Sequence, residues 1–213
     1  MSSLALSNLS VDGIADAKLR RVARRFRAVM EELDLDLGDP HLEGTELRVA
    51  RAYREQFAGL AAGAEPALRT FPNTERYSEV VSLVGIPFSS LCAHHFLPFV
   101  GSVHVAYKPG ELIVGLSKLA RVVEFYARRP QVQERMTEQI VEFLDRELRP
   151  AGVMVVVQAR HCCIETRGVN CVGIVTTTSA VRGVFKEDRH RLEFWALLPR
   201  PVDSLNVGNE KDA

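Results

Sequence analysis

Hydrophobic residues recur with a helical period near the start of the chain. Two stripes follow a spacing close to 3.6 residues, one formed by Ile14, Leu19, Val22, Phe26, Val29 and Met30 and one by Leu47, Ala50, Tyr53 and Phe57. We therefore expect an N-terminal helical region at residues 12–63, after a flexible N-terminus at residues 1–11. The basic run RRVARR in the first helix fits a solvated face between apolar rows.

The pattern changes to strands after residues 62–79, which contain two prolines, show no clear period and are expected to form a linker. In residues 79–91 and 100–110, β-branched and aromatic residues alternate with small or polar ones. Such alternation predicts two strands, each with one apolar face and one face of small or polar residues, followed by a turn at residues 108–111.

Two helices and two further strands complete the pattern. Apolar residues at a helical period, interrupted by Pro130, predict helices at residues 118–129 and 131–148. Residues 152–163 and 173–185 again resemble strands in composition.

The order of these elements indicates the fold class. Two strands, two helices and two strands in succession favour an α+β fold, with an antiparallel four-stranded sheet and two helices on one face, over a parallel doubly wound sheet. We assign this domain to residues 64–200, followed by a flexible C-terminal tail at residues 201–213.

Charge and composition exclude several classes of function. The 27 basic and 27 acidic residues balance, so the sequence gives no support for nucleic acid as a partner. No apolar stretch is long enough for a membrane span, and the first ten residues lack a secretory pattern, so we expect a cytoplasmic protein without membrane contact. In that compartment the four cysteines are expected as reduced thiols or metal ligands rather than disulfides.

Cys92 and His95 have the short spacing that lets two side chains bind one metal ion, and thiolate with imidazole suits zinc. A lone pair of this kind also occurs by chance in packed cores. Cys162 and Cys163 follow a predicted strand and would point to opposite faces if the strand continued, so at most one is expected to complete the set. Three protein ligands with a fourth position left to water would be a catalytic arrangement.

Two helix starts carry candidate substrate-binding groups. Ser117 is the expected N-cap of the helix at 118–129, and Lys118 and Arg121 lie in its first turn, where the helix dipole disfavours cations unless an anion binds. A solvated charged face is the alternative interpretation. Near the start of the next helix, Glu134 could accept two N–H bonds from guanine, with Gln133 beside it.

Four motifs in order along the chain resemble those of the GTP cyclohydrolase I family, the zinc enzymes that open pterin and tetrahydrofolate biosynthesis. They are SLCAHHFLPFVGSVHVAY, GLSKLARVVEFYARRPQVQER, HCCIETRGV and TTTSAVRGVF, and the resemblance runs from about residue 42 to residue 198. It implies a tunnelling fold (T-fold), whose subunits join their sheets into pentameric rings. Two rings stack as a homodecamer, with active sites between subunits.

The resemblance also implies roles for individual residues. It assigns the zinc ligands to Cys92, His95 and Cys163, and the catalytic histidines to His94 and His161. It assigns triphosphate binding to Ser117, Lys118, Arg121 and Arg167, and basic groups lent by a neighbouring subunit to Arg48 and Arg51. Guanine recognition falls to Glu134, supported by Gln133.

The implied reaction is zinc-dependent hydrolysis of GTP to 7,8-dihydroneopterin triphosphate and formate. Zinc would lower the pKa of a bound water. His161 would protonate the imidazole ring of the purine, which makes C8 electrophilic, and His94 would help to shuttle later protons.

Several positions depart from the family pattern. They are Glu46, Val84, Gly85, Ala93, Cys162, Glu165 and Thr166. None of these departures removes an expected metal ligand or catalytic histidine, but they affect positions around the metal site that orient the ligands. Two alternatives therefore stay open. One is a catalytically idle zinc-binding subunit. The other is a specialised T-fold paralogue that acts on another purine or pterin, including a reductase with a cysteine nucleophile.

Overall fold

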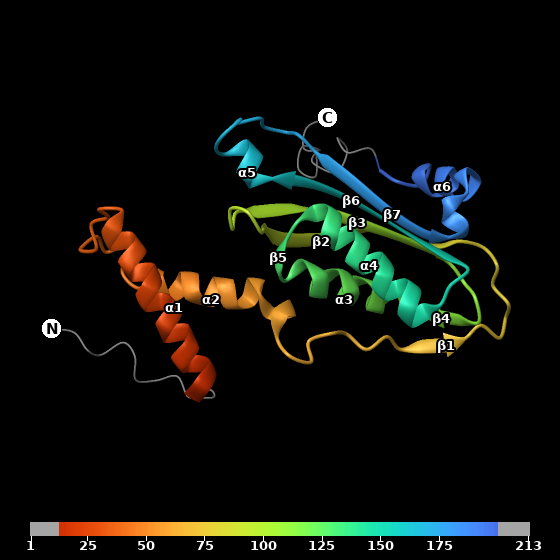
Figure 1. Cartoon of the computed structure of the whole chain (residues 1–213), viewed down its shortest axis with the longest axis horizontal. Helices are drawn as coiled ribbons and strands as arrows, with labels where there is room; N and C mark the ends of the chain where they lie inside the picture. The colour runs from red at the N-terminus through yellow and green to blue at the C-terminus, as the bar shows by residue number, and fades with distance from the viewer. Residues whose placement is uncertain (1–12, 200–213) are drawn as a thin grey trace, which may run out of the picture. The chain divides into compact units, whose positions relative to one another are not determined.

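The structure is a computed structural model, which describes residues 13–199 (Figure 1). The chain divides between Phe57 and Ala58 into two compact units, which are described separately. The segments predicted to be flexible, residues 1–11 and 201–213, lie outside the described residues.

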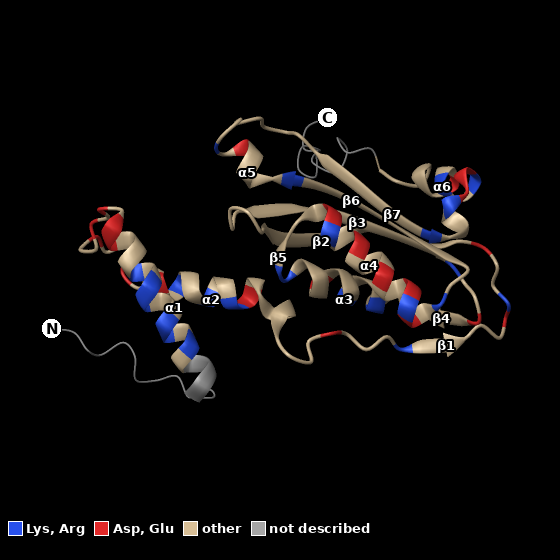
Figure 2. Cartoon of the chain, in the orientation of Figure 1, with Lys and Arg blue, Asp and Glu red and all other residues tan. Residues whose placement is uncertain are grey.

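The N-terminal unit is a pair of helices, α1 at Gly13–Glu32 and α2 at Thr45–Gln56. Its small core contains Leu19, Ala23 and Ala50. The predicted stripe on the first helix is partly wrong, because Val22 and Val29 are 37% and 48% exposed. The basic residues of α1 are exposed, as predicted, and Figure 2 shows them in blue along the helix.

The second unit contains a five-stranded sheet in the order β5-β2-β3-β6-β7. Its four main strands pair antiparallel, as predicted, and are β2 Val81–Cys92, β3 Pro98–Lys108, β6 Gly152–His161 and β7 Thr176–Gly183. The short strand β5, Pro130–Gln131, adds to the edge of β2 in parallel. Two more strands, β1 Thr70–Pro72 and β4 Leu112–Val114, form a separate two-stranded sheet. Strand β1 lies within the predicted linker, and β4 directly follows the predicted turn.

Helices α3, Leu116–Ala127, and α4, Gln133–Leu148, cover one face of the main sheet (Figure 1). Two predicted details are wrong. The N-cap of α3 is Gly115, so Ser117 lies inside the helix. The second helix begins at Gln133 rather than at residue 131, because residues 130–131 pair with β2.

The other face of the sheet is also covered in part. Beyond β7 the chain forms a 3-10 turn, η2 Val184–Lys186, and helix α6 Asp188–Trp195, which the sequence pattern did not predict. Phe185 and Phe194 pack there against Ala106 of β3 and against Met154 and Val156 of β6. A further 3-10 turn, η1 Ala58–Leu60, and a short helix, α5 Cys162–Glu165, complete the described elements. None of the helices described at residues 13–199 has the length and apolar character to span a bilayer.

Gly85 forms an irregularity in β2, where the register with β3 shifts between Leu83 and Ile86. Its φ is +80°, a left-handed conformation that favours glycine, and its N–H donates to Nδ1 of His104 at 3.1 Å. The departure from the family pattern at this position therefore has a local structural reason.

Gly101 allows β3 and β6 to approach closely near the ends of the strands that carry the candidate site. It pairs with Ala159, and a Cβ at position 101 would lie 1.9 Å from the carbonyl oxygen of Gln158. The two backbones could not keep this separation around a larger residue.

We expect Gly101→Ala to lower the free energy of unfolding by about 1–3 kcal/mol or more, because β3 must move away from β6. Chemical denaturation measures this change. Gly115→Ala is the matched control, since a Cβ there meets no atom within 4 Å. Its effect should stay below about 1 kcal/mol, and equal losses in the two variants would contradict the close-approach argument.

Candidate metal centre

The tight connection between β2 and β3 holds Cys92 and His95 side by side. The backbone N–H of Phe96 donates to the carbonyl of Cys92 at 2.8 Å, and that of Cys92 donates to Leu97 at 2.9 Å. Phe96 adopts a φ of +53°, which turns the chain back towards β3. As a result, Nδ1 of His95 lies 3.7 Å from Sγ of Cys92.

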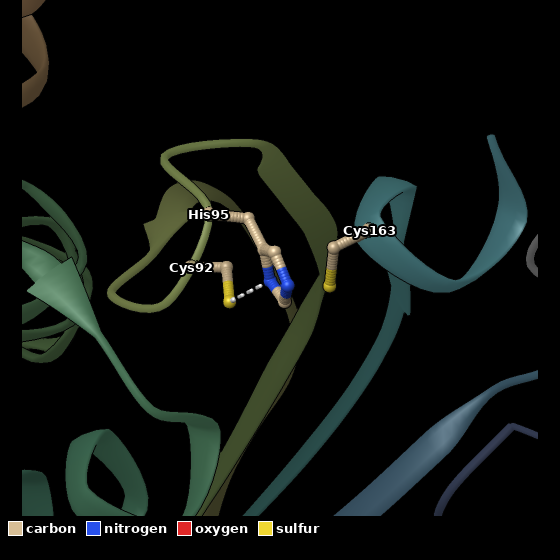
Figure 3. A group of neighbouring side chains, drawn as sticks. All are labelled: Cys92, His95 and Cys163. Atoms are coloured by element: carbon tan, nitrogen blue, oxygen red, sulfur yellow. Dashed lines mark hydrogen bonds between the residues drawn. The ribbon is translucent and has the colours of Figure 1, made fainter. Parts of the chain in front are cut away.

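Cys163 approaches the same point from a distant part of the sequence. Phe99 at the start of β3 pairs with His161 at the end of β6, so the residues just after β6 lie beside the β2–β3 connection. The strand ends at His161 and α5 begins at Cys162, which turns the Cys163 side chain towards Cys92 and His95 (Figure 3). The ligand atoms of the three residues all lie within 4.8 Å of one another.

This group of atoms fits a tetrahedral zinc ion. Zn–S and Zn–N bonds of about 2.3 and 2.0 Å would place ligand atoms about 3.5–3.8 Å apart, close to the separation of Cys92 and His95. Burial and the neighbouring Cys92 thiol raise the pKa of Cys163, because two thiolates repel each other, and a divalent cation would reverse that preference. Cys92 is buried whereas His95 is exposed, so one side of the group is open to solvent.

An ion pair that sequence reasoning missed anchors the segment around Cys163. Arg160 donates two hydrogen bonds to the carboxylate of Glu165, at 2.6 and 2.9 Å, and Glu165 also accepts from the backbone N–H of Gly173 at 3.1 Å. These bonds tie the end of β6 to α5 and to the loop that follows. The hydrogen bonds from Arg160 hold the pKa of Glu165 below its usual value.

Two predicted residues lie at the edge of the triad formed by Cys92, His95 and Cys163. Nδ1 of His94 is 3.7 Å from Sγ of Cys92, and the His94 side chain is exposed. Nη1 of Arg167, in the loop after α5, lies 3.3 Å from Nε2 of His95. The structure thus brings one predicted catalytic histidine and one predicted anion-binding arginine to the candidate metal ligands.

His161 is held by two residues of the core. Its ring stacks on Phe99, with centroids 4.7 Å apart and an interplanar angle of 2°, and its Nε2 lies 2.8 Å from Oε1 of Gln133. Burial lowers the pKa of His161, and the Glu134 and Glu165 carboxylates oppose this effect. Gln133 is buried, whereas Glu134 is exposed.

Two of the residues predicted to bind triphosphate, Ser117 and Lys118, lie at the start of α3, far from the triad of the same chain. Helix α3 starts after β4 and ends before β5, which pairs with β2 at Leu91 and Cys92. Its 12 residues span about 18 Å, so Ser117 and Lys118 lie at the end remote from Cys92, whereas Arg121 lies near the middle of the helix. Figure 1 shows α3 between β4 and β5. The first turn has no acidic residue, as the sequence indicated.

Arg48 and Arg51 belong to α2 of the N-terminal unit. The guanidinium of Arg48 donates to the carbonyl of Glu43 and to Oγ1 of Thr45, both at 2.7 Å. Their predicted contribution to the site of a neighbouring subunit stays a prediction.

Comparison with known proteins identifies similar sequences over most of the chain. The profile of the family described as GTP cyclohydrolase I matches residues 22–198. A protein named GTP cyclohydrolase 1 from Mycolicibacterium vanbaalenii is 50% identical over 171 residues, which cover 78% of this chain and 84% of that protein. Proteins of the same name from Mycobacterium ulcerans and Mycobacterium bovis are 51% and 48% identical, over 77% and 76% of this chain and 84% and 83% of theirs.

We expect Arg160→Met to weaken the binding of a divalent metal ion, probed with zinc, by about 10-fold, because α5 loses the bonds that orient Cys163. Competition of the purified protein with a chromogenic chelator measures the affinity. Arg182→Met is the matched control, since it removes an arginine ion pair to Glu138 that joins β7 to α4. Equal zinc affinities in both variants would show that the Arg160–Glu165 pair does not orient the ligand.

Proposed function

The chain belongs to the GTP cyclohydrolase I family, and from this premise we propose that Cys92, His95 and Cys163 hold one zinc ion beside which GTP is converted to 7,8-dihydroneopterin triphosphate and formate. The observation that carries this proposal is the convergence of two sulfurs and one imidazole within 4.8 Å from two separate segments. A set of three ligands with an open side is typical of catalytic rather than structural zinc.

The residues around the triad supply proton transfer. Zinc held by Cys92, His95 and Cys163 would supply a water molecule of lowered pKa. His161 protonates the imidazole ring of guanine, which makes C8 electrophilic so that water adds and the ring opens to a formamide. His94, exposed beside Cys92, passes protons during the second hydration that releases formate. Rearrangement of the ribose and ring closure then give the product.

Other residues hold the two ends of GTP. Glu134 accepts two N–H bonds from the guanine edge, and its exposure at the start of α4 supports this role. Arg167 binds the triphosphate next to the triad, together with Ser117, Lys118 and Arg121 at the start of α3, where backbone N–H groups and the helix dipole also favour an anion.

A neighbouring copy of the chain completes each site. The position of Ser117 and Lys118 at the end of α3 remote from the triad supports this proposal, because one chain then offers the two halves of the site at opposite ends of that helix. We extend it to a homodecamer of two pentameric rings in the cytoplasm, in which the N-terminal unit lends Arg48 and Arg51. Its product would enter pterin and tetrahydrofolate biosynthesis.

We expect purified protein to contain about one zinc per chain and to release formate from GTP. His161→Ala should keep the zinc and lose about 10²–10⁴-fold in turnover, because it removes a general acid and not a ligand. Elemental analysis and a formate assay measure the two quantities.

His190→Ala, which removes a histidine from α6, is the control and should keep both zinc and turnover. Zinc at full occupancy without formate from any guanine nucleotide would support the idle zinc-binding subunit instead. Turnover by metal-free protein would overturn the hydrolytic proposal.

Mixed oligomers test whether the site is shared. Arg121→Ala and His161→Ala should each be inactive alone, but a mixture that is dissociated and reassembled should regain activity at roughly one quarter of its sites, since random pairing leaves that fraction with both intact halves. Each variant taken alone through the same cycle is the control. Reassembly without recovery would mean that both halves of a site come from one chain.

A further inference from the structure

The amide of Gln133 has a fixed orientation. This side chain at the first position of α4 is only 2% exposed. Its Nε2 donates towards the carbonyl oxygens of Val157 and Thr176, at 3.1 and 3.0 Å, and lies 3.2 Å from Oγ1 of Thr178. A flipped amide would place Oε1 against two carbonyl oxygens, so Oε1 must be the atom that faces His161.

This orientation determines which nitrogen of His161 carries hydrogen. An amide oxygen only accepts hydrogen bonds, so Nε2 of His161, 2.8 Å from Oε1 of Gln133, must be the donor. The parallel stack on Phe99, which is fully buried, sets the plane of the ring. Gln133 sets the rotation of the ring within that plane.

We propose that Gln133 is a positioning residue that holds His161 as the Nε2–H tautomer, so that Nδ1 is the nitrogen that exchanges a proton with the substrate. The destination of that proton rests on the proposed function, whereas the position of the hydrogen on the ring does not. Serine proteases show the importance of this kind of control, since a histidine in the wrong tautomer loses most of its activity.

The proposal replaces the role in guanine binding that the sequence suggested for Gln133. Both N–H groups of its amide are directed at backbone and hydroxyl oxygens of β6 and β7, and its oxygen is directed at His161. No donor of this amide is left for a purine. Glu134, the next residue, is exposed and keeps its carboxylate for the base.

The tautomer can be read directly by solid-state nuclear magnetic resonance of the full-length, zinc-loaded protein labelled with ¹⁵N-histidine. The chain has six histidines, and the signals of His161 are those absent from the His161→Gln protein. At about pH 8, where the imidazole is neutral, we expect wild-type His161 to carry hydrogen on Nε2 alone. Hydrogen on Nδ1 in the wild-type protein would overturn the proposal without any variant of Gln133.

Variants of Gln133 separate positioning from substrate binding. Gln133→Met should add the Nδ1–H form and lower kcat for formate release by about 10- to 100-fold, part of the 10²–10⁴-fold effect of a general acid, with little change in KM for GTP. A Gln133→Met protein that keeps the Nε2–H tautomer, or in which only KM rises, would overturn the proposal.

Gln139→Met is the matched control. It removes another glutamine of α4, whose Oε1 accepts from Gln131 at 2.9 Å. It should leave the His161 signals as in the wild type. If the tautomer depends on Gln133 but the wild-type protein releases no formate from GTP, the positioning role stands and the proposed function fails.

Discussion

The antiparallel pairing of β3 with β6 is the interaction on which the candidate site depends. The pairing of Phe99 with His161 places the end of β6 beside the β2–β3 connection. Cys163 thereby comes within reach of Cys92 and His95, and the His161 ring stacks on Phe99. A shift of one residue in this register would turn the side chains of β6 to the opposite face of the sheet and remove both contacts.

Electrostatics then makes this region favourable for a cation. Two thiols close together in a partly buried position resist ionisation, and the pKa of Cys163 is raised accordingly. A divalent ion held by Cys92 and Cys163 would convert that repulsion into attraction, because both sulfurs would bind it as thiolates. The Arg160–Glu165 pair balances its own charges and ties Cys163 to the strand, so it adds orientation without competing for the ion.

The direction of α3 separates its N-terminal end from the candidate metal site of the same chain. Its C-terminal end leads through β5 to the strand that carries Cys92, and its N-terminal end, with Ser117 and Lys118, lies about 18 Å away along the helix. Between these ends, the apolar side of α3 covers the sheet through residues such as Leu119 and Val122.

The sequence by itself determined the four antiparallel strands, the two covering helices and the spacing of Cys92 and His95, because alternation, helical period and short-range spacing are local properties. It left the choice between Cys162 and Cys163 open until the family resemblance was considered, since that choice depends on where β6 ends. It also missed α6, whose residues show no strong amphipathic pattern, and the Arg160–Glu165 pair. Only the tertiary structure decided that Gln133 faces His161, because the contact joins residues of α4 and β6 through strand register and burial, which no local pattern encodes.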